Sequence, residues 1–414
     1  MLLNFRSAAR SIAVTGAVGI LAGCAEKTMT GPGAQEPVRP LTTVEQDVVS
    51  ASTGFGLALL QNVHAAESAP NVLLSPLSAS MALGMALNGA AGTTFNAMRD
   101  ALGFDGMSED QINRAYRGLV AQLRARDPKV EFRLANSVWY ERTFQVKAPF
   151  IQAARDYFDA EVTALDFTSA SAPGTISQWA EQQTGGRIRD LVDAIDPLDR
   201  MILVNAVYFK APWTMPFEPN ATRNGAFTRA DGSEVQVPLM SGDRSYPSFS
   251  DDDVQIVELP YADTAFSMVL LAPAAGNTLD VLTAELTAAQ WDGWMSELRA
   301  QRLMLTVPKF RFEYDIEMNA VLDVMGMGIA FQPRVADFTR IADVDDLHIS
   351  RVRQKAFIDV HELGTEAAAA TSVTISVTSM PPVMRFDRPF LFAIRERSTG
   401  TILFVGRVGD PSAS

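Results

Sequence analysis

Apolar residues recur at helical spacing in two stretches near the start of the main body of the chain. Within the segment 43–64 their spacing is mostly helical, which predicts an opening helix. The positions concerned are Val44, Val48, Val49, Phe55, Leu59 and Leu60. Ser75 followed by Pro76 is typical of a helix start, because proline in the first turn lacks only a donor that would have no partner there. The apolar residues that follow predict a second helix.

Shorter apolar runs along the rest of the chain predict a mixed fold. Strand-like runs, rich in β-branched and aromatic residues, lie at 131–140, 201–209, 254–259, 265–272, 303–312, 355–361, 389–394 and 401–407. Helical segments are expected near 108–125, 147–158, 175–192, 278–299 and 315–326. Strands and helices do not alternate regularly. The pattern therefore favours an α+β fold, of the multi-domain α and β type, over a doubly wound sheet.

The segment 365–378 has an unusual pattern for a loop. Alternate residues from Thr365 to Val377 fall on one face, and the second half of the segment alternates β-branched apolar residues with Ser and Thr. Such alternation is typical of a half-buried strand. The first half is almost all Ala and Thr, so it could slide between two existing strands with little steric cost. An ordinary edge strand is the alternative that the segment by itself leaves open.

Charge and composition narrow the function. The chain has 414 residues, of which 47% are apolar and 20% charged, an ordinary globular composition. Its formal charge of −13 argues against nucleic acid as a partner, since such binding needs a basic face to displace counterions. Cys24 is the one cysteine, so no intramolecular disulfide can form and packing alone must hold the fold.

The N-terminus resembles a bacterial lipoprotein signal. A short basic start precedes the apolar run 12–21, which is too short to span a bilayer as a permanent helix. The Leu-Ala-Gly sequence before Cys24 resembles a lipobox, where cleavage leaves a lipidated cysteine; a plain secretory signal is the alternative. We therefore expect a lipoprotein signal peptide at 1–23, a lipid-anchored flexible tether at 24–42 and one folded domain at 43–414. This organisation predicts a membrane-anchored, extracytoplasmic protein of the bacterial cell envelope, at the outer membrane or cell surface or on the periplasmic face.

Several segments, in this order from about residue 44 to the C-terminus, carry a family resemblance. They are Asn71–Ser78 with Asn88–Thr94, Asn205–Trp213, Val307–Phe310, Met325–Gly328, Val360–Thr371, Phe386–Phe390 and Phe404–Val408. Together they resemble the landmarks of the serpin family of protease inhibitors. The resemblance implies a serpin fold with three β-sheets, eight or nine helices and an exposed reactive-centre loop at about 362–385. It also implies a monomer that needs neither cofactor nor metal.

The resemblance implies a suicide-substrate mechanism for the loop. The scissile bond is expected at Thr378–Ser379, or one residue earlier, with Val377, Ser376 and Met380 in the neighbouring subsites. After cleavage, residues 365–377 would insert into the main sheet as a new strand, while the target protease stays covalently bound as an acyl-enzyme. The hinge for this movement comprises Glu362, Gly364, Thr365, Glu366, Ala367, Ala368, Ala369, Ala370 and Thr371. Targets would be elastase-like or subtilisin-like serine proteases, or papain-like cysteine proteases.

The resemblance also implies residues that control the opening of the sheet. Lys309 and Glu362 match a pair near the top of the main sheet, beside Trp213. Beneath the sheet, family members have a polar cluster to which three residues of this chain correspond, Ser75, Ser78 and Asn205. The histidine usual in that cluster is replaced by Gln354, an amide that can still donate and accept hydrogen bonds.

The residues also bear on two rival functions. An enzyme is disfavoured, because the three histidines, His64, His348 and His361, sit in no nucleophile-elbow or zinc-protease motif. A non-inhibitory serpin that acts as a surface binding protein is the serious alternative. The small residues at 367–370 favour inhibition, since non-inhibitory members tend to carry bulky, charged or proline residues at these positions.

Overall fold

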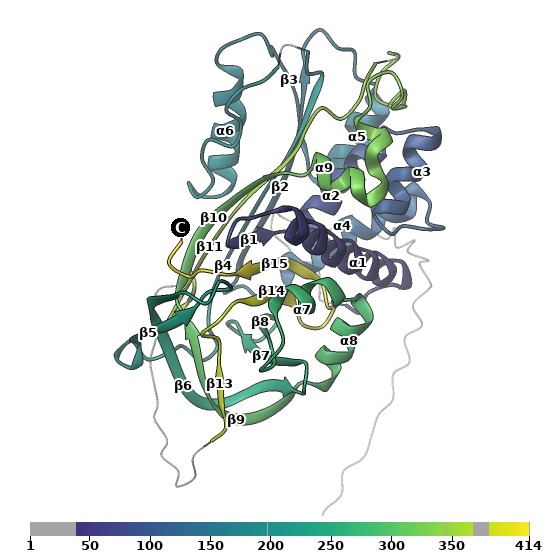
Figure 1. Cartoon of the computed structure of the whole chain (residues 1–414). Helices are drawn as coiled ribbons and strands as arrows, with labels where there is room; N and C mark the ends of the chain where they lie inside the picture. Colours follow the sequence, from purple (N-terminus) through teal and green to yellow (C-terminus); the bar gives the residue numbers. More distant parts are fainter. Residues whose placement is uncertain (1–38, 197, 345, 367–380, 414) are drawn as a thin grey trace, which may run out of the picture. The chain divides into compact units, whose positions relative to one another are not determined.

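The computed structural model describes residues 39–196, 198–344, 346–366 and 381–413. Nine α-helices lie within these ranges: α1 (Thr43–Ala66), α2 (Pro76–Leu87), α3 (Gly92–Ala101), α4 (Glu109–Ala125), α5 (Ala148–Phe158), α6 (Ala172–Gln183), α7 (Leu279–Glu285), α8 (Ala288–Glu297) and α9 (Asn319–Leu322). The helices and strands form one α+β domain (Figure 1).

The main sheet has six strands in the order β10-β11-β12-β4-β2-β3. Their bounds are β2 (Glu131–Glu141), β3 (Glu161–Leu165), β4 (Met201–Pro212), β10 (Phe310–Glu317), β11 (Val352–His361) and β12 (Gly364–Thr365). β2 and β4 pair antiparallel along most of their length, as do β10 and β11. β4 and β11 are parallel to each other and pair directly only where 203–205 lies beside 352–354.

The other nine strands form a second hydrogen-bonded network in the order β1-β15-β14-β8-β7-β6-β9-β13, with β5 paired to β6. They are β1 (Asn71–Leu74), β5 (Arg223–Thr228), β6 (Glu234–Ser250), β7 (Val254–Pro260), β8 (Phe266–Pro273), β9 (Arg299–Pro308), β13 (Val383–Arg385), β14 (Phe390–Glu396) and β15 (Ile402–Val408). The second and third expected sheets are thus joined, because the long strand β6 pairs with β5, β9 and β7 along its length.

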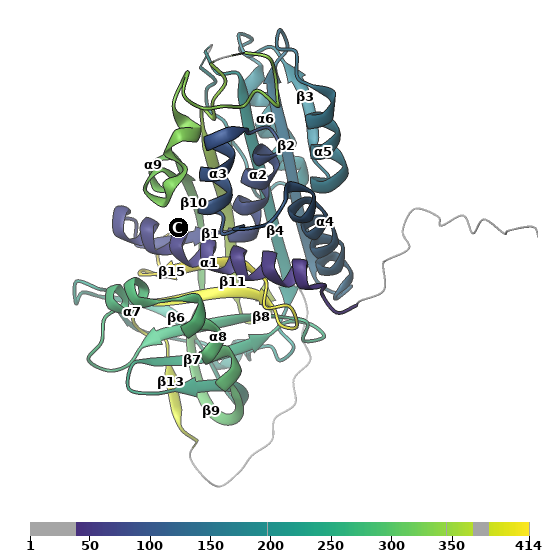
Figure 2. The same cartoon turned by 90° about the vertical axis from the view of Figure 1, so that its right-hand side faces the viewer.

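Helices cover both faces of the main sheet. Figure 1 shows α6 on one side of the long strands and α1 to α5 on the other, and Figure 2 gives the perpendicular view. On the α6 side, Ile176 and Trp179 pack with Trp139 of β2 and with Val204 of β4 in a small separate core. We call this side the outer face of the sheet. The inner face joins the main core, which holds alternate residues of β4 and β11.

Most expected elements are present, with differences at their ends. The helix expected at 175–192 ends at Gln183, and the one expected at 278–299 is two helices, α7 and α8. The strand expected at 303–312 is two strands, β9 and β10, with Lys309 between them. Residues 315–326 continue β10 to Glu317 before the short helix α9 begins. At 303–312 the error arose because buried apolar residues lie on both sides of Lys309, so that two strands resemble one run.

The domain begins before residue 43. Thr42 caps α1 by accepting a hydrogen bond from the backbone N–H of Glu45, and the Glu45 carboxylate pairs with Arg39. The backbone N–H of Arg39 donates to Gln122 Oε1 on α4 at 3.1 Å. Residues 39–42 therefore pack with the folded domain. Cys24 and the expected signal peptide 1–23 lie outside the described residues. No helix in the described ranges is long and apolar enough to cross a membrane.

Candidate functional site at the sheet opening

The short strand β12 places the start of the hinge inside the main sheet. Gly364 and Thr365 pair antiparallel with His361 and Val360 of β11 on one side. On the other side the same two residues pair antiparallel with Pro212 and Ala211 of β4. Gly364 has a φ of +150°, a conformation that residues with side chains rarely adopt, and this lets the chain reverse between β11 and β12. The start of the expected hinge therefore lies in the sheet as a short central strand.

Aromatic residues pack against the core-facing side of this strand. The Thr365 hydroxyl lies 2.6 Å from Tyr261 Oη, and both residues are buried. Burial raises the pKa of the Tyr261 phenol well above its usual range, so the group stays protonated and can donate. The Tyr261 ring stacks on Trp213 at 4.4 Å between centroids, and Trp213 Nε1 donates to the His361 carbonyl at 2.9 Å. These contacts hold Thr365 against the core.

An ion pair closes the turn that leads into β12. Lys309 Nζ lies 3.0 Å from Glu362 Oε2, and Thr222 donates to the other carboxylate oxygen at 2.8 Å. Burial raises the pKa of Glu362, but its hydrogen bonds, with the charge of Lys309, outweigh burial and hold the pKa below its ordinary value. The Glu362 side chain is 11% exposed, so solvent screens this pair only in part.

Glu366 marks the point at which the described chain leaves the sheet. Its φ is +51°, a left-handed conformation that is strained for a residue with a side chain. Its backbone N–H still donates to the Asp359 carbonyl of β11 at 3.1 Å. Tyr208 Oη of β4 donates to one carboxylate oxygen at 2.7 Å, and Arg187 Nε lies 3.1 Å from the other. Glu366 is thereby held on the outer face, where β12 ends between β11 and β4.

A slot separates β12 from the direct pairing of β4 with β11. Between β12 and this direct pairing, residues 355–359 of β11 and 206–210 of β4 have no ladder pairing with each other among the described strands. The two strands meet again where Gln354 lies beside Asn205. The ladder between β4 and β11 is thus interrupted for five residues on each strand, and this unpaired stretch is what we call the slot.

A polar cluster lies on the inner face at the lower end of the slot. Gln354 Oε1 accepts from the backbone N–H of Ser75 at 2.8 Å, and Gln354 Nε2 donates to the Ser75 carbonyl at 3.1 Å. Asn205 Nδ2 donates to Asn136 Oδ1 of β2 at 2.5 Å. Among the described residues, two buried oxygens of the cluster have no hydrogen-bond partner, Asn205 Oδ1 and Ser78 Oγ. The amide of Gln354 thus ties the inner face of β11 to the start of α2.

A family model of serpins, described as serine protease inhibitors, matches residues 50–411. The chain belongs to the serpin family. It is 35% identical over 378 residues to a serpin-like protein of Thermococcus kodakarensis, covering 89% of this chain and 86% of that protein. It is 34% identical over 365 residues to neuroserpin of Gallus gallus, covering 85% of this chain and 88% of that one.

Solved serpin structures match over nearly the whole chain. The native state of tengpin, a thermophilic serpin, gives a TM-score of 0.83 at 31% identity, over 91% of this chain and 97% of that one. Human thyroxine-binding globulin in complex with thyroxine gives a TM-score of 0.83 at 28% identity, over 90% of this chain and all of that one. The expected serpin fold is confirmed, and with it membership of a family of protease inhibitors.

The structure brings some of the expected site residues into contact. Lys309, Glu362 and Trp213 lie together at the end of the sheet next to β12. Ser75 contacts Gln354 on the inner face of the sheet. Asn205 bonds to Asn136 instead of to either serine. The remaining hinge residues 367–371, the bond Thr378–Ser379 and the subsites Ser376, Val377 and Met380 lie outside the described residues. Sequence reasoning missed Asn136, Arg187, Tyr208, Thr222 and Tyr261, which no motif singled out.

Proposed function

We propose that this serpin inhibits proteases as a suicide substrate, with residues 365–377 inserting between β4 and β11 after cleavage. The observation that carries the proposal is the position of β12. The hinge already occupies the sheet between these two strands, antiparallel to both, and an open slot continues below it. Insertion then extends a strand that exists in the uncleaved protein, which avoids the cost of nucleating a new one.

The register of β12 says where each further residue would go. Continuing the pairs Thr365–Val360 and Thr365–Ala211 places residues 366–370 along the slot and Thr371 beside both Gln354 and Asn205. The two strands thus lead to the same pair of residues, which are themselves paired with each other. Glu366 and the four alanines 367–370 therefore match the five unpaired positions. Insertion beyond Thr371 must separate 352–354 from 203–205.

The alternation of side chains along 365–377 also matches the two faces of the sheet. Thr365 points to the core, so alternate residues after it would do the same, ending with Val373, Ile375 and Val377. Each apolar side chain buried would contribute about 1.5–3 kcal/mol, and each ladder hydrogen bond about 0.5–1.5 kcal/mol. The sum is on the order of ten kcal/mol or more, enough to displace a protease that is covalently attached to the loop.

We infer the target class from the loop sequence. No Lys or Arg occurs between Lys355 and Arg385, so trypsin-like proteases lack a basic residue to bind. Thr378 on the acyl side of the bond, with Val377 before it, suits elastase-like and subtilisin-like serine proteases. Papain-like cysteine proteases are also suited, because they recognise the apolar residue one position before the acyl residue, here Val377. An alternative, a non-inhibitory surface binding protein, draws support from the likeness to thyroxine-binding globulin. The alanine hinge and the matching slot favour inhibition.

We further propose that lipid on Cys24 anchors the inhibitor to the cell envelope, facing away from the cytoplasm. The basic start, the short apolar run and the position of the one cysteine support this. Two or more acyl chains on one cysteine would give stable anchoring, whereas a single chain is marginal.

A covalent complex tests the inhibitory mechanism. Incubation with an elastase-like serine protease should give a species that survives boiling in detergent and contains both proteins. The same protease with its catalytic serine replaced by alanine should give none, because the complex depends on an acyl bond. Cleaved inhibitor together with fully active protease and no such species would contradict the proposal and favour the binding protein.

A further inference from the structure

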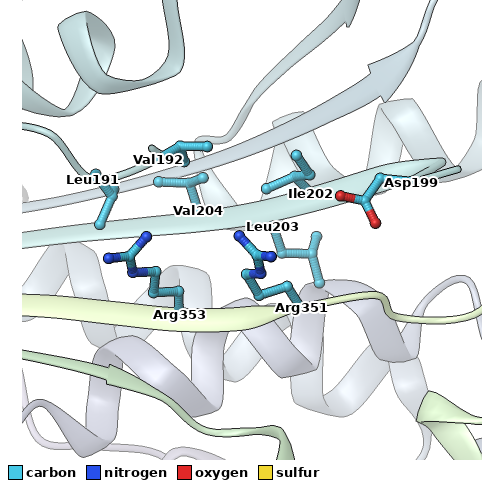
Figure 3. A pocket seen from close by; sticks show the side chains of 8 residues that line it. All are labelled: Leu191, Val192, Asp199, Ile202, Leu203, Val204, Arg351 and Arg353. Carbon is cyan, nitrogen blue, oxygen red and sulfur yellow. The ribbon is translucent and has the colours of Figure 1, made fainter. Parts of the chain in front are cut away.

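The narrow cavity between β4 and the β11 side is too small to bind a ligand. It measures about 10 Å³ and lies between apolar residues of β4, such as Leu203, and the side chains of Arg351 and Arg353 (Figure 3). A volume of that size holds about one water molecule. The exposed surface is therefore the better place for a further partner to bind.

Two exposed apolar side chains lie side by side on neighbouring strands. Among the described residues, seven large apolar side chains are exposed, and only Met304 of β9 and Val383 of β13 pair with each other in a strand ladder. Met304 is 39% exposed and Val383 is 52% exposed. The next residues along, Leu305 and Met384, are buried, as expected for side chains on the opposite face of the sheet.

The chain that follows the expected scissile bond is fixed beside this pair. The backbone N–H of Met304 donates to the Pro382 carbonyl at 2.8 Å, one residue before β13 begins. Pro382 is also exposed. Residues after a scissile bond form its prime side, so we call Pro382, Val383 and Met304 the prime-side strip. From Thr378 to Pro382 the chain advances four residues, which span at most about 14 Å.

A protease bound at Thr378–Ser379 is wider than this distance. A compact domain of roughly 250 residues has a radius of gyration of about 18 Å, so its surface reaches about 20 Å to each side of a central cleft. The prime-side strip therefore lies within the footprint of a protease that attacks this bond.

The charges around the strip are paired with one another. Asp243 of β6 is the ladder partner of Met304, and Arg302 binds it through two hydrogen bonds of 2.8 Å. Beyond Val383, Arg385 Nε donates to Asp387 Oδ2 at 2.9 Å. The strip thus has an apolar centre and a rim of neutralised charges, although the whole chain carries a net charge of −13. Apolar centres with polar rims are typical of protein interfaces.

We propose that the prime-side strip is a docking surface for the target protease, and that it favours proteases whose surface beside the prime side of the cleft is apolar and uncharged. The contact forms before cleavage and therefore raises the rate of complex formation. A charged protease residue at this place would lose its water against Met304 and Val383, which slows association. This inference rests on the proposed inhibitory function.

The test measures the second-order rate constant at which the full-length protein forms the covalent complex with an elastase-like serine protease. Met304→Glu should lower this rate constant about tenfold, and Met304→Gln should lower it less, because an amide costs less to desolvate than a carboxylate. Met304 belongs to β9 and not to the strand that continues the loop, so its substitution leaves the chain of the loop unchanged.

Val324→Glu is the matched control. Val324 is 75% exposed and directly follows α9, which lies far from β13 in Figures 1 and 2. This variant gains the same charge and should react at the wild-type rate.

The other outcomes separate the docking surface from the inhibitory function. Equal rates for Met304→Glu and wild type, with a covalent complex from both, would refute the docking surface and leave inhibition standing. No covalent complex from the wild-type protein would refute inhibition, and the docking surface with it. A wild-type dimer in size-exclusion chromatography that Met304→Glu converts to a monomer would assign the strip to a second copy of this chain and overturn the proposal.

Discussion

The hydroxyl of Thr365 lies 2.6 Å from Tyr261 Oη, a residue 104 positions away in the sequence, so the hinge is already seated in the core of the uncleaved protein. The next residue, Glu366, has a left-handed backbone with a φ of +51°. Continued insertion would relax Glu366 to an extended conformation. In the proposed mechanism, this arrangement corresponds to the first step of insertion.

Thr365→Arg should convert the inhibitor into a substrate. Thr365 is 2% exposed, and an unpaired arginine at this position would cost several kcal/mol to bury, so the hinge would be expelled from the sheet. The protease should then cleave the loop and leave, which a detergent gel shows as cleaved serpin without complex. Thr228→Arg, at an exposed position of β5, is the matched control and should inhibit normally. Normal inhibition by Thr365→Arg would show that insertion does not begin at this residue.

Thr371→Val should weaken only the cleaved form. The register of β12 brings Thr371 to Asn205, whose Oδ1 accepts no hydrogen bond from the described residues. A valine would leave that oxygen buried and unpaired, at a cost of about 1–3 kcal/mol. The melting temperature of cleaved protein should fall, and that of uncleaved protein should not. Thr374→Val, which the same register places on the outer face, should change neither; equal effects of the two substitutions would refute the register.

The ion pair at the hinge predicts a loss of stability in acid. The pKa of Glu362 is lowered from its ordinary value of 4.5, so its carboxylate stabilises the folded state above that pH. The stabilisation is lost as the pH falls through the lowered pKa, because the native state must then take up a proton. Lys309→Met should reduce this dependence. Urea unfolding at pH 7 and pH 4 measures it, and a difference between the two pH values as large in the variant as in wild type would contradict the assignment.

A second pH effect arises at the far end of α1. Burial and the adjacent Arg407 lower the pKa of His64 from its ordinary value of 6.5, although Asp280 opposes them. The unfolded chain then binds a proton that the folded protein does not, so stability should fall as the pH drops below about 6.5. His64→Gln should flatten the melting temperature between pH 7.5 and pH 5. An unchanged slope would show that folding does not lower the pKa of His64.

Sequence patterns predicted the fold class, most elements and those site residues that lie within ordered motifs. Lys309, Glu362 and Trp213 were identified because each sits in a contiguous landmark of the family. Tyr261 and Arg187 could not be, because their roles depend on contacts between segments far apart in the chain. The break at Lys309 was missed for a related reason, since the strands on either side are both rich in buried apolar residues and read as one run.

The melting temperature of intact against loop-cleaved protein tests the central claim most directly. Cleavage by an elastase-like protease, with the released C-terminal peptide identified by mass spectrometry as starting at Ser379, defines the cleaved sample. If the loop becomes a central strand, the cleaved form should melt tens of degrees higher, since on the order of ten kcal/mol is gained. Identical melting temperatures for the two forms would contradict insertion and the inhibitory mechanism built on it.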